Sequence, residues 1–239
     1  MFKTCIIESR KRNNPDIIKT NDFTITFDYP FKNVNKVHLV GCYLPHTIYN
    51  IDSSNNSFTF TTDATYSLFL LNGNYTVTTL IQQLEDEMNL FSPTVFTISY
   101  SSVSYKITIQ ASTNFQLNLI NSTLANVIGF NHVNYPSANV IVSDNAVDLN
   151  IPLVNICINE FGIDSIGKGD FNTFVVPINC IPNQLIIYNE NNNFKQDVCF
   201  YRSKDIWSLN ISLRKKDGFL LENNNTEWTM ILLIELFKN

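Results

Sequence analysis

Apolar and polar residues alternate along much of the chain, beginning with Phe23–Phe27. A period of two residues is typical of a β-strand with one buried face. Two such runs, Phe96–Tyr100 and Tyr105–Ile109, are separated only by Ser101–Ser104, which predicts a hairpin. Further strands are predicted at Lys36–Tyr43, Ser57–Thr61, Tyr66–Leu71, Phe115–Leu119, Leu149–Ile158, Phe171–Ile178, Gln184–Tyr188, Trp207–Leu213 and Glu227–Phe237.

The last predicted strand, Glu227–Phe237, is apolar on both faces. Alternate residues from Trp228 to Leu236 would lie on one face, and Ile231, Leu233 and Phe237 on the other. A strand of this kind must be covered on both sides. In an antiparallel sandwich the second cover is a helix, a loop or another subunit. We therefore predict an interface at Ile231, Leu233 and Phe237.

Two segments have helical patterns. Thr76–Phe91 places its larger apolar residues on one stripe, with Thr76 or Asn74 as a candidate N-cap. Ser122–Ile128 is predicted to be a short turn of helix, ended by Gly129 in a left-handed conformation.

The order of these elements favours an all-β fold. With 239 residues the chain can form one large β domain or two small ones, and it contains neither an internal repeat nor a long linker. Many strands without a βαβ rhythm predict an antiparallel β-sandwich, a single jelly roll with one or two short inserted helices. We expect this jelly-roll domain at residues 21–239, preceded by a basic arm at residues 1–20.

The charge distribution supports an arm. Within residues 1–20, five basic residues, among them Lys3, Arg10, Lys11 and Arg12, face two acidic ones, whereas the whole chain has a net charge of −5. An acidic chain is a poor general nucleic-acid binder, so no specific nucleic acid is expected as a partner. The arm is instead predicted to contact a polyanion or an acidic neighbour, the alternative being a solvated end. Charged residues make up only 15% of the chain, against about 25% in an average soluble domain, which indicates contact with other subunits.

Catalytic signatures are mostly absent. There is no nucleophile elbow, zinc-protease motif or dinucleotide fingerprint, and Gly167–Gly169 is too short to cradle a phosphate alone. Cys42 with His38 or His46 is a conceivable nucleophile pair, although structural roles are favoured. The acidic run Glu85–Glu87 is interpreted as a solvated helix face. We therefore expect no catalytic residues, no metal site, no cofactor and no enzyme activity.

Targeting and redox features are equally sparse. The first residues contain no apolar signal region, and the longest apolar stretch, Met230–Phe237, is too short to span a bilayer, so no transmembrane segment is expected. The five scattered cysteines contain no C-x-x-C pair and are predicted to be free thiols.

Four segments carry a resemblance to a known group of proteins. Ile6–Asn13 is similar to an arm with a D-S-x-x-R-N pattern, here with Glu8 in place of the commoner Asp. Leu39–Asn56 reads LVGCYLPHTIYNIDSSNN, a strand, a proline turn and an Asn pair before the next strand. Asn72–Phe130 combines a helix, a hairpin and the stretch LANVIGF, and Leu213–Ile234 has an Asp-Gly turn and a Trp before an apolar strand. In this order they resemble the jelly-roll penton and minor capsid proteins of large double-stranded DNA viruses and virophages.

The resemblance implies a structural protein of the virion, assembled in the cytoplasm of the host cell into an icosahedral capsid. A penton at the capsid vertices, self-associated as a pentamer and contacting the major capsid protein, is the leading hypothesis. One alternative is an internal minor capsid protein that cements neighbouring capsomers. Another is a carbohydrate-binding attachment module, with Tyr43, Tyr49, Tyr66 and Tyr135 as candidate exposed aromatics.

Overall fold

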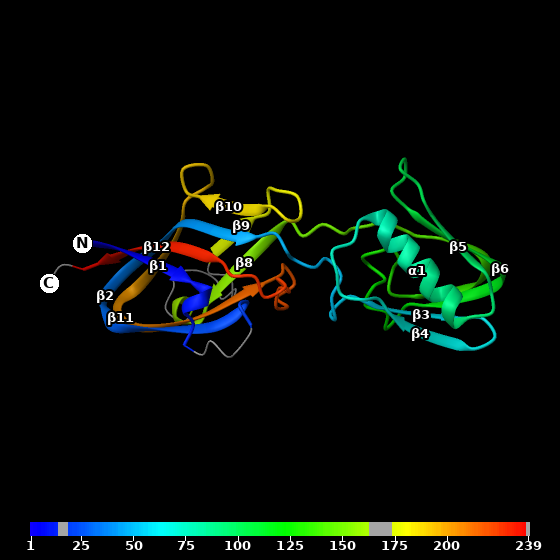
Figure 1. The fold of residues 1–239 in the computed structure, drawn as a ribbon, viewed down its shortest axis with the longest axis horizontal. Helices are drawn as coiled ribbons and strands as arrows, with labels where there is room; N and C mark the ends of the chain where they lie inside the picture. Colours follow the sequence, from blue (N-terminus) through cyan, green and yellow to red (C-terminus); the bar gives the residue numbers. More distant parts are fainter. Residues whose placement is uncertain (14–18, 163–173, 238–239) are drawn as a thin grey trace. The chain divides into compact units, whose positions relative to one another are not determined.

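The computed structural model describes residues 1–13, 19–162 and 174–237, and their fold is all-β with few helical residues (Figure 1). The chain divides into two compact units, one of Met1–Ile48 with Ile151–Asn239 and one of Tyr49–Asn150. The strands are β1 (Phe2–Glu8), β2 (Asp22–Pro45), β3 (Ser57–Thr61), β4 (Thr65–Phe69), β5 (Phe96–Tyr100), β6 (Ile107–Asn118), β7 (Asn134–Val142), β8 (Leu153–Ile158), β9 (Phe174–Pro177), β10 (Leu185–Asn189), β11 (Gln196–Arg214) and β12 (Thr229–Leu236). The helices are α1 (Val77–Phe91), α2 (Asn159–Gly162) and the 3-10 turn η1 (Ser9–Lys11).

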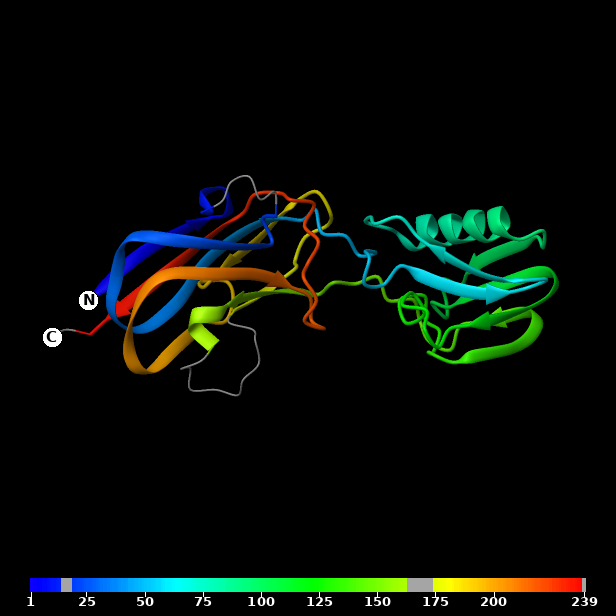
Figure 2. The same ribbon diagram turned by 90° about the horizontal axis from the view of Figure 1, so that it is seen from below.

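The first unit is one antiparallel sheet folded into two layers. Its longest strands, β2 and β11, pair along most of their length and bend together (Figures 1 and 2). One layer holds β1, β12, the second half of β2, and β10 with the start of β11. The other holds the first half of β2, the second half of β11, β8 and β9. These two layers contain eight segments. In chain order they are β1 (1), the first (2) and second (3) halves of β2, β8 (4), β9 (5), β10 with the start of β11 (6), the second half of β11 (7) and β12 (8). The layers then have the orders 1-8-3-6 and 2-7-4-5, which is the strand order of a jelly roll.

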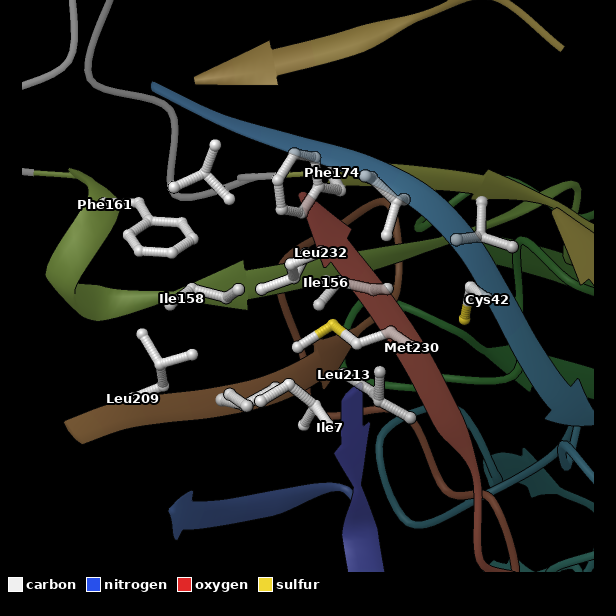
Figure 3. Packing of buried hydrophobic residues seen from close by; sticks show 14 of the residues in the cluster. Ile7, Cys42, Ile156, Ile158, Phe161, Phe174, Leu209, Leu213, Met230 and Leu232 are labelled. Carbon is white, nitrogen blue, oxygen red and sulfur yellow. The ribbon is translucent and has the colours of Figure 1, made fainter. Parts of the chain in front are cut away.

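The hydrophobic core of this unit lies between the two layers. Ile7, Met230 and Leu232 from the first layer meet Ile156 and Leu213 from the second (Figure 3). Each is almost completely buried, so each contributes about 1.5–3 kcal/mol relative to an exposed side chain. The predicted inward face of the last strand is confirmed.

The second unit is inserted in the chain between β2 and β8, the third and fourth segments of the jelly roll. Its sheet has the order β4-β3-β6-β5, and β7 also pairs with β6. Figure 2 shows α1 along one face of this sheet, and Leu80, Leu84 and Met88 of α1 are buried against it. Thr76 is the N-cap, because its hydroxyl accepts from the N–H of Thr79 and the Thr79 hydroxyl accepts from the N–H of Thr76.

The two units do not match the predicted division into an arm of residues 1–20 and one domain of residues 21–239. Residues 2–8 are not an arm but the edge strand β1, paired with β12 along its whole length. The expected single domain of residues 21–239 contains a separate core formed by residues 51–141. The physical reason is that strands of both units have the same period of two, so alternation alone does not say which strands share a core.

Several local predictions need correction. Phe23–Phe27 and Lys36–Tyr43 lie in one bent strand, β2, and Ser122–Ile128 forms turns rather than a helix. Trp207 is 57% exposed, because a register shift between Ile206 and Ser208 interrupts the alternation of β11. Strand β7 was not predicted, and Gly167–Gly169 and the first residues of Phe171–Ile178 lie outside the described residues.

Gly129 gives a test of the inserted unit. Its φ is +81°, and a Cβ there would lie 2.3 Å from the carbonyl oxygen of Asn145. Gly129→Ala is therefore expected to destabilise the fold in two ways. The new methyl group clashes with the backbone, and a non-glycine residue in the left-handed conformation adds a further penalty of about 1–2 kcal/mol. Gly218 has a φ of +88° with nothing within 4 Å, so Gly218→Ala should incur the conformational cost alone. We expect a clearly larger fall in thermal midpoint for Gly129→Ala, and equal falls would contradict this packing.

Candidate interaction surface

The layer that contains β12 has an outer face as well as a core face. Residues that lie side by side across β1, β12 and β2 form rungs, for example Ile6, Ile231 and Gly41. The next rung holds Thr4 and Leu233. We use the term outer apolar face for Phe2, Ile6, Tyr43, Ile187, Ile231 and Leu233.

The outer apolar face is open within the described residues. Phe2 is 58% exposed, Ile6 60% and Ile187 45%, while Ile231 and Leu233 are half-buried. A Cβ at Gly41 would lie 3.6 Å from the Tyr43 ring and 3.8 Å from Ile231, so these two side chains lie close together over the glycine. The result is a broad apolar surface on a solvent-facing sheet, a feature that marks interaction sites.

A charged cluster crosses the same face. The Nζ of Lys36 lies 2.6 Å from Asp197 Oδ2, and the Nδ1 of His38 contacts Asp197 Oδ1. Burial alone would raise the pKa of Asp197, but hydrogen bonds from Lys36 and His38 outweigh it and hold this pKa below its usual value. The hydrogen bond to Asp197 likewise raises the pKa of Lys36. Paired charges thus lie directly beside Leu233 on this face.

The lowered pKa of Asp197 predicts that the fold is less stable in acid. Because its pKa is lower when folded, the carboxylate stabilises the fold above its unfolded value, near 3.8, and this contribution is lost as the pH falls through the folded value. Asp197→Asn should therefore lower the free energy of unfolding at pH 7 and have progressively less effect below about pH 4. Urea unfolding across this pH range measures the difference. Asp28→Asn, at an exposed carboxylate without an ion pair in the described structure, is the control and should change little.

The basic residues predicted to form an arm are held by the fold. Arg10 and Lys11, in η1, both form ion pairs with Glu8, and Lys3 lies exposed in β1. Arg12 is mostly covered and lies 3.0 Å from Glu227. The predicted interface residues therefore separate into two groups. Ile231 and Leu233 lie on the outer apolar face, whereas the others lie outside it: Phe237 is 58% exposed just after β12, Lys3 lies near the start of β1, and Arg10, Lys11 and Arg12 follow its end.

Three members of the outer apolar face, Phe2, Ile6 and Ile187, were not predicted. For Phe2 and Ile6 a signal was available in the sequence. The run Cys5–Ile7 is apolar on both faces of its strand, as in β12, and this was the available signal. The basic residues that follow it indicated an arm instead.

Cys42 and His38 were predicted to share a face of one strand, with structural roles favoured over a nucleophile pair, and this placement is wrong. Cys42 lies in the core and His38 on the outer face, because a register shift in the β2–β12 pairing between Leu39 and Gly41 reverses the alternation. Burial raises the pKa of Cys42 to about 12, so its thiol is not ionised near neutral pH. His46 lies instead beside Cys180, with 3.9 Å between its Nδ1 and the sulfur.

Two of the candidate exposed aromatics, Tyr66 and Tyr135, form structural contacts within their own unit. The Tyr66 ring stacks on Phe60, and its hydroxyl donates to Asp63. The Tyr135 hydroxyl donates to Asp144, and its ring packs edge-on against Phe130.

Residues 1–13, 19–162 and 174–237 contain neither a cluster of metal ligands nor a membrane-spanning helix. In that part, no three His, Cys, Asp or Glu residues converge as metal ligands would. No helix there is both long and apolar enough to cross a bilayer.

Comparison with known proteins identifies the family. The chain belongs to a family of unknown function, DUF5901, whose model matches residues 3–195. No curated protein matches the sequence. Among solved structures, the selenomethionine-labelled penton protein of mavirus aligns over 99% of this chain and 100% of its own, with 12% identity and a TM-score of 0.48. The jelly-roll assignment therefore rests on the strand registers of this chain.

Proposed function

We propose that this protein is a structural component of a virus particle, most specifically a penton at the vertices of an icosahedral capsid. The observation that carries the proposal is the outer apolar face of a jelly-roll layer, at the place where the last strand is apolar on both sides. A shell subunit is surrounded by neighbours, so an apolar sheet face of this kind is covered after assembly.

The resemblance of the sequence segments to penton and minor capsid proteins supports the same proposal. The inferred location is the virion, with assembly in the cytoplasm of the host cell. The inferred partners are further copies of this chain, forming a pentamer, and the major capsid protein. In a ring, one subunit's outer apolar face meets a different surface of the next subunit, which is a heterologous contact.

The basic end of β1 is a second part of the proposed interface. Arg10 and Lys11 are both exposed, and together they outnumber the single carboxylate of Glu8 that pairs with them. They leave a net positive charge at this end of β1, which fits an acidic surface on a neighbouring subunit, and Lys3 adds a further positive charge near the other end.

The mass of the full-length protein in solution tests the ring. Light scattering is expected to give five copies or a multiple of five. A stable monomer across the accessible concentration range would exclude a self-assembled penton and favour the internal minor capsid alternative.

Polar substitution on the outer face should weaken self-association. The double variant Ile231→Ser, Leu233→Ser removes two half-buried side chains from the face and leaves Met230 and Leu232 in the core. We expect at least a roughly 10-fold increase in the dissociation constant, measured by sedimentation, because the apolar contact is lost.

Val103→Ser is the matched control for this prediction. Val103 is an 89% exposed apolar residue at the β5–β6 hairpin and is not a member of the outer apolar face. An equal loss of association in both variants, or none in the double variant, would contradict the proposed interface.

A further inference from the structure

The edge of β1 has unpaired backbone groups. Met1 and Leu236 exchange backbone hydrogen bonds at 3.1 and 2.8 Å, and Ser9 donates to the carbonyl of Trp228 at 3.0 Å. The β1–β12 register contains no shift, so the odd-numbered residues of β1 face β12 and the backbone groups of Phe2, Thr4 and Ile6 face away. Within the described residues, these outward N–H and C=O groups have no hydrogen-bond partner.

Three other strand edges are closed by polar side chains, those of β9, β5 and the first half of β2. On β9, both backbone groups of Val175 bond to the amide of Gln196, at 2.6 Å each. On β5, the amide of Asn89 bonds to both backbone groups of Phe96, and the carboxylate of Glu85 accepts from the N–H of Ile98.

The first half of β2 is closed in the same way by Asn13. Its side-chain oxygen accepts from the N–H of Thr26, and its N–H donates to the carbonyl of Thr24. Such closure prevents unwanted strand pairing. Strand β1 has no comparable cover in the described part of the chain, which leaves it able to accept a further strand.

The outward pattern of β1 is complementary to itself. In a two-fold antiparallel pair centred on Thr4, each Phe2 lies opposite Ile6 of the other copy, and the two Thr4 residues face each other. All the outward N–H and C=O groups of residues 2, 4 and 6 are then paired. Lys3 lies opposite Cys5, so no like charges meet, and aromatic–aliphatic and Thr–Thr pairs are favourable cross-strand neighbours.

We propose that two copies of this protein associate through their β1 strands, which form a continuous antiparallel sheet across a two-fold axis. The contact is isologous and uses backbone groups, whereas the ring contact proposed above is heterologous and uses side chains of the outer apolar face. It does not rest on the proposed function, because a jelly roll with an open edge can pair in this way in any setting.

Disulfide trapping tests the register. Thr4→Cys in a Cys199→Ser background, which removes the exposed native thiol, is expected to give a covalent dimer on a non-reducing denaturing gel after mild oxidation. Opposed residues have Cα atoms about 5.5 Å apart, within disulfide range.

Phe2→Cys in the same background is the matched control and should give no dimer alone, since the two copies of residue 2 lie about 13 Å apart along the strands. Mixed with Ile6→Cys, it should cross-link. The absence of a Thr4→Cys dimer, or equal cross-linking of Phe2→Cys alone, would overturn the proposed register.

A proline variant tests whether the pairing contributes to assembly in solution. Thr4→Pro removes an outward N–H and retains the hydrogen bonds to β12, so the protein should remain folded by circular dichroism with its weight-average mass reduced twofold. Cys5→Pro, which removes an N–H that faces β12, should instead lower the thermal midpoint. An unchanged mass for folded Thr4→Pro would overturn the proposal, whereas loss of fivefold stoichiometry with retained Thr4→Cys cross-linking would overturn only the penton assignment.

Discussion

The paired bend of β2 and β11 is the constraint on which the jelly roll depends. Every backbone group in the interior needs a hydrogen-bond partner, and these two strands satisfy each other while passing from one layer to the other. Register shifts between Cys199 and Ser208 allow the turn without ending the ladder. Because the pair bends, one sheet supplies both walls of the core, and Met230 and Leu232 can pack against Ile156 and Leu213.

The same bend determines which apolar residues remain outside. A sheet in two layers has one inner and one outer face per layer, and the core takes only the inner ones. Strand β12 lies between β1 and β2 in its layer. Its outward residue Ile231 has Ile6 on one side and Gly41 with the nearby Tyr43 ring on the other, whereas Leu233 lies between Thr4 and His38. An apolar surface built from three adjacent strands differs from isolated exposed residues, which are common on proteins.

The inserted unit shows how a second core can be added without disturbing the first. It lies in the chain between Ile48 and Ile151, in place of the loop that joins two jelly-roll strands. Its helix α1 has two roles: Leu80, Leu84 and Met88 cover the sheet, while Glu85 and Asn89 close the edge of β5. The acidic run Glu85–Glu87 was interpreted as a solvated helix face, but the carboxylate of Glu85 accepts a hydrogen bond from the backbone of β5.

Much of this structure follows from local pattern alone. The helix at residues 77–91 with its Thr76 cap, the hairpin at Ser101–Ser104 and the two apolar faces of the last strand are properties of sequence neighbours, because side-chain direction and capping depend on residues a few positions apart. The association of strands into two cores, the position of β1 and the separation of His38 from Cys42 were decided only by the tertiary structure. They depend on pairings between residues more than two hundred positions apart, and on a bulge that reverses the side-chain alternation of β2 between His38 and Cys42. Neither leaves a local signal in the sequence.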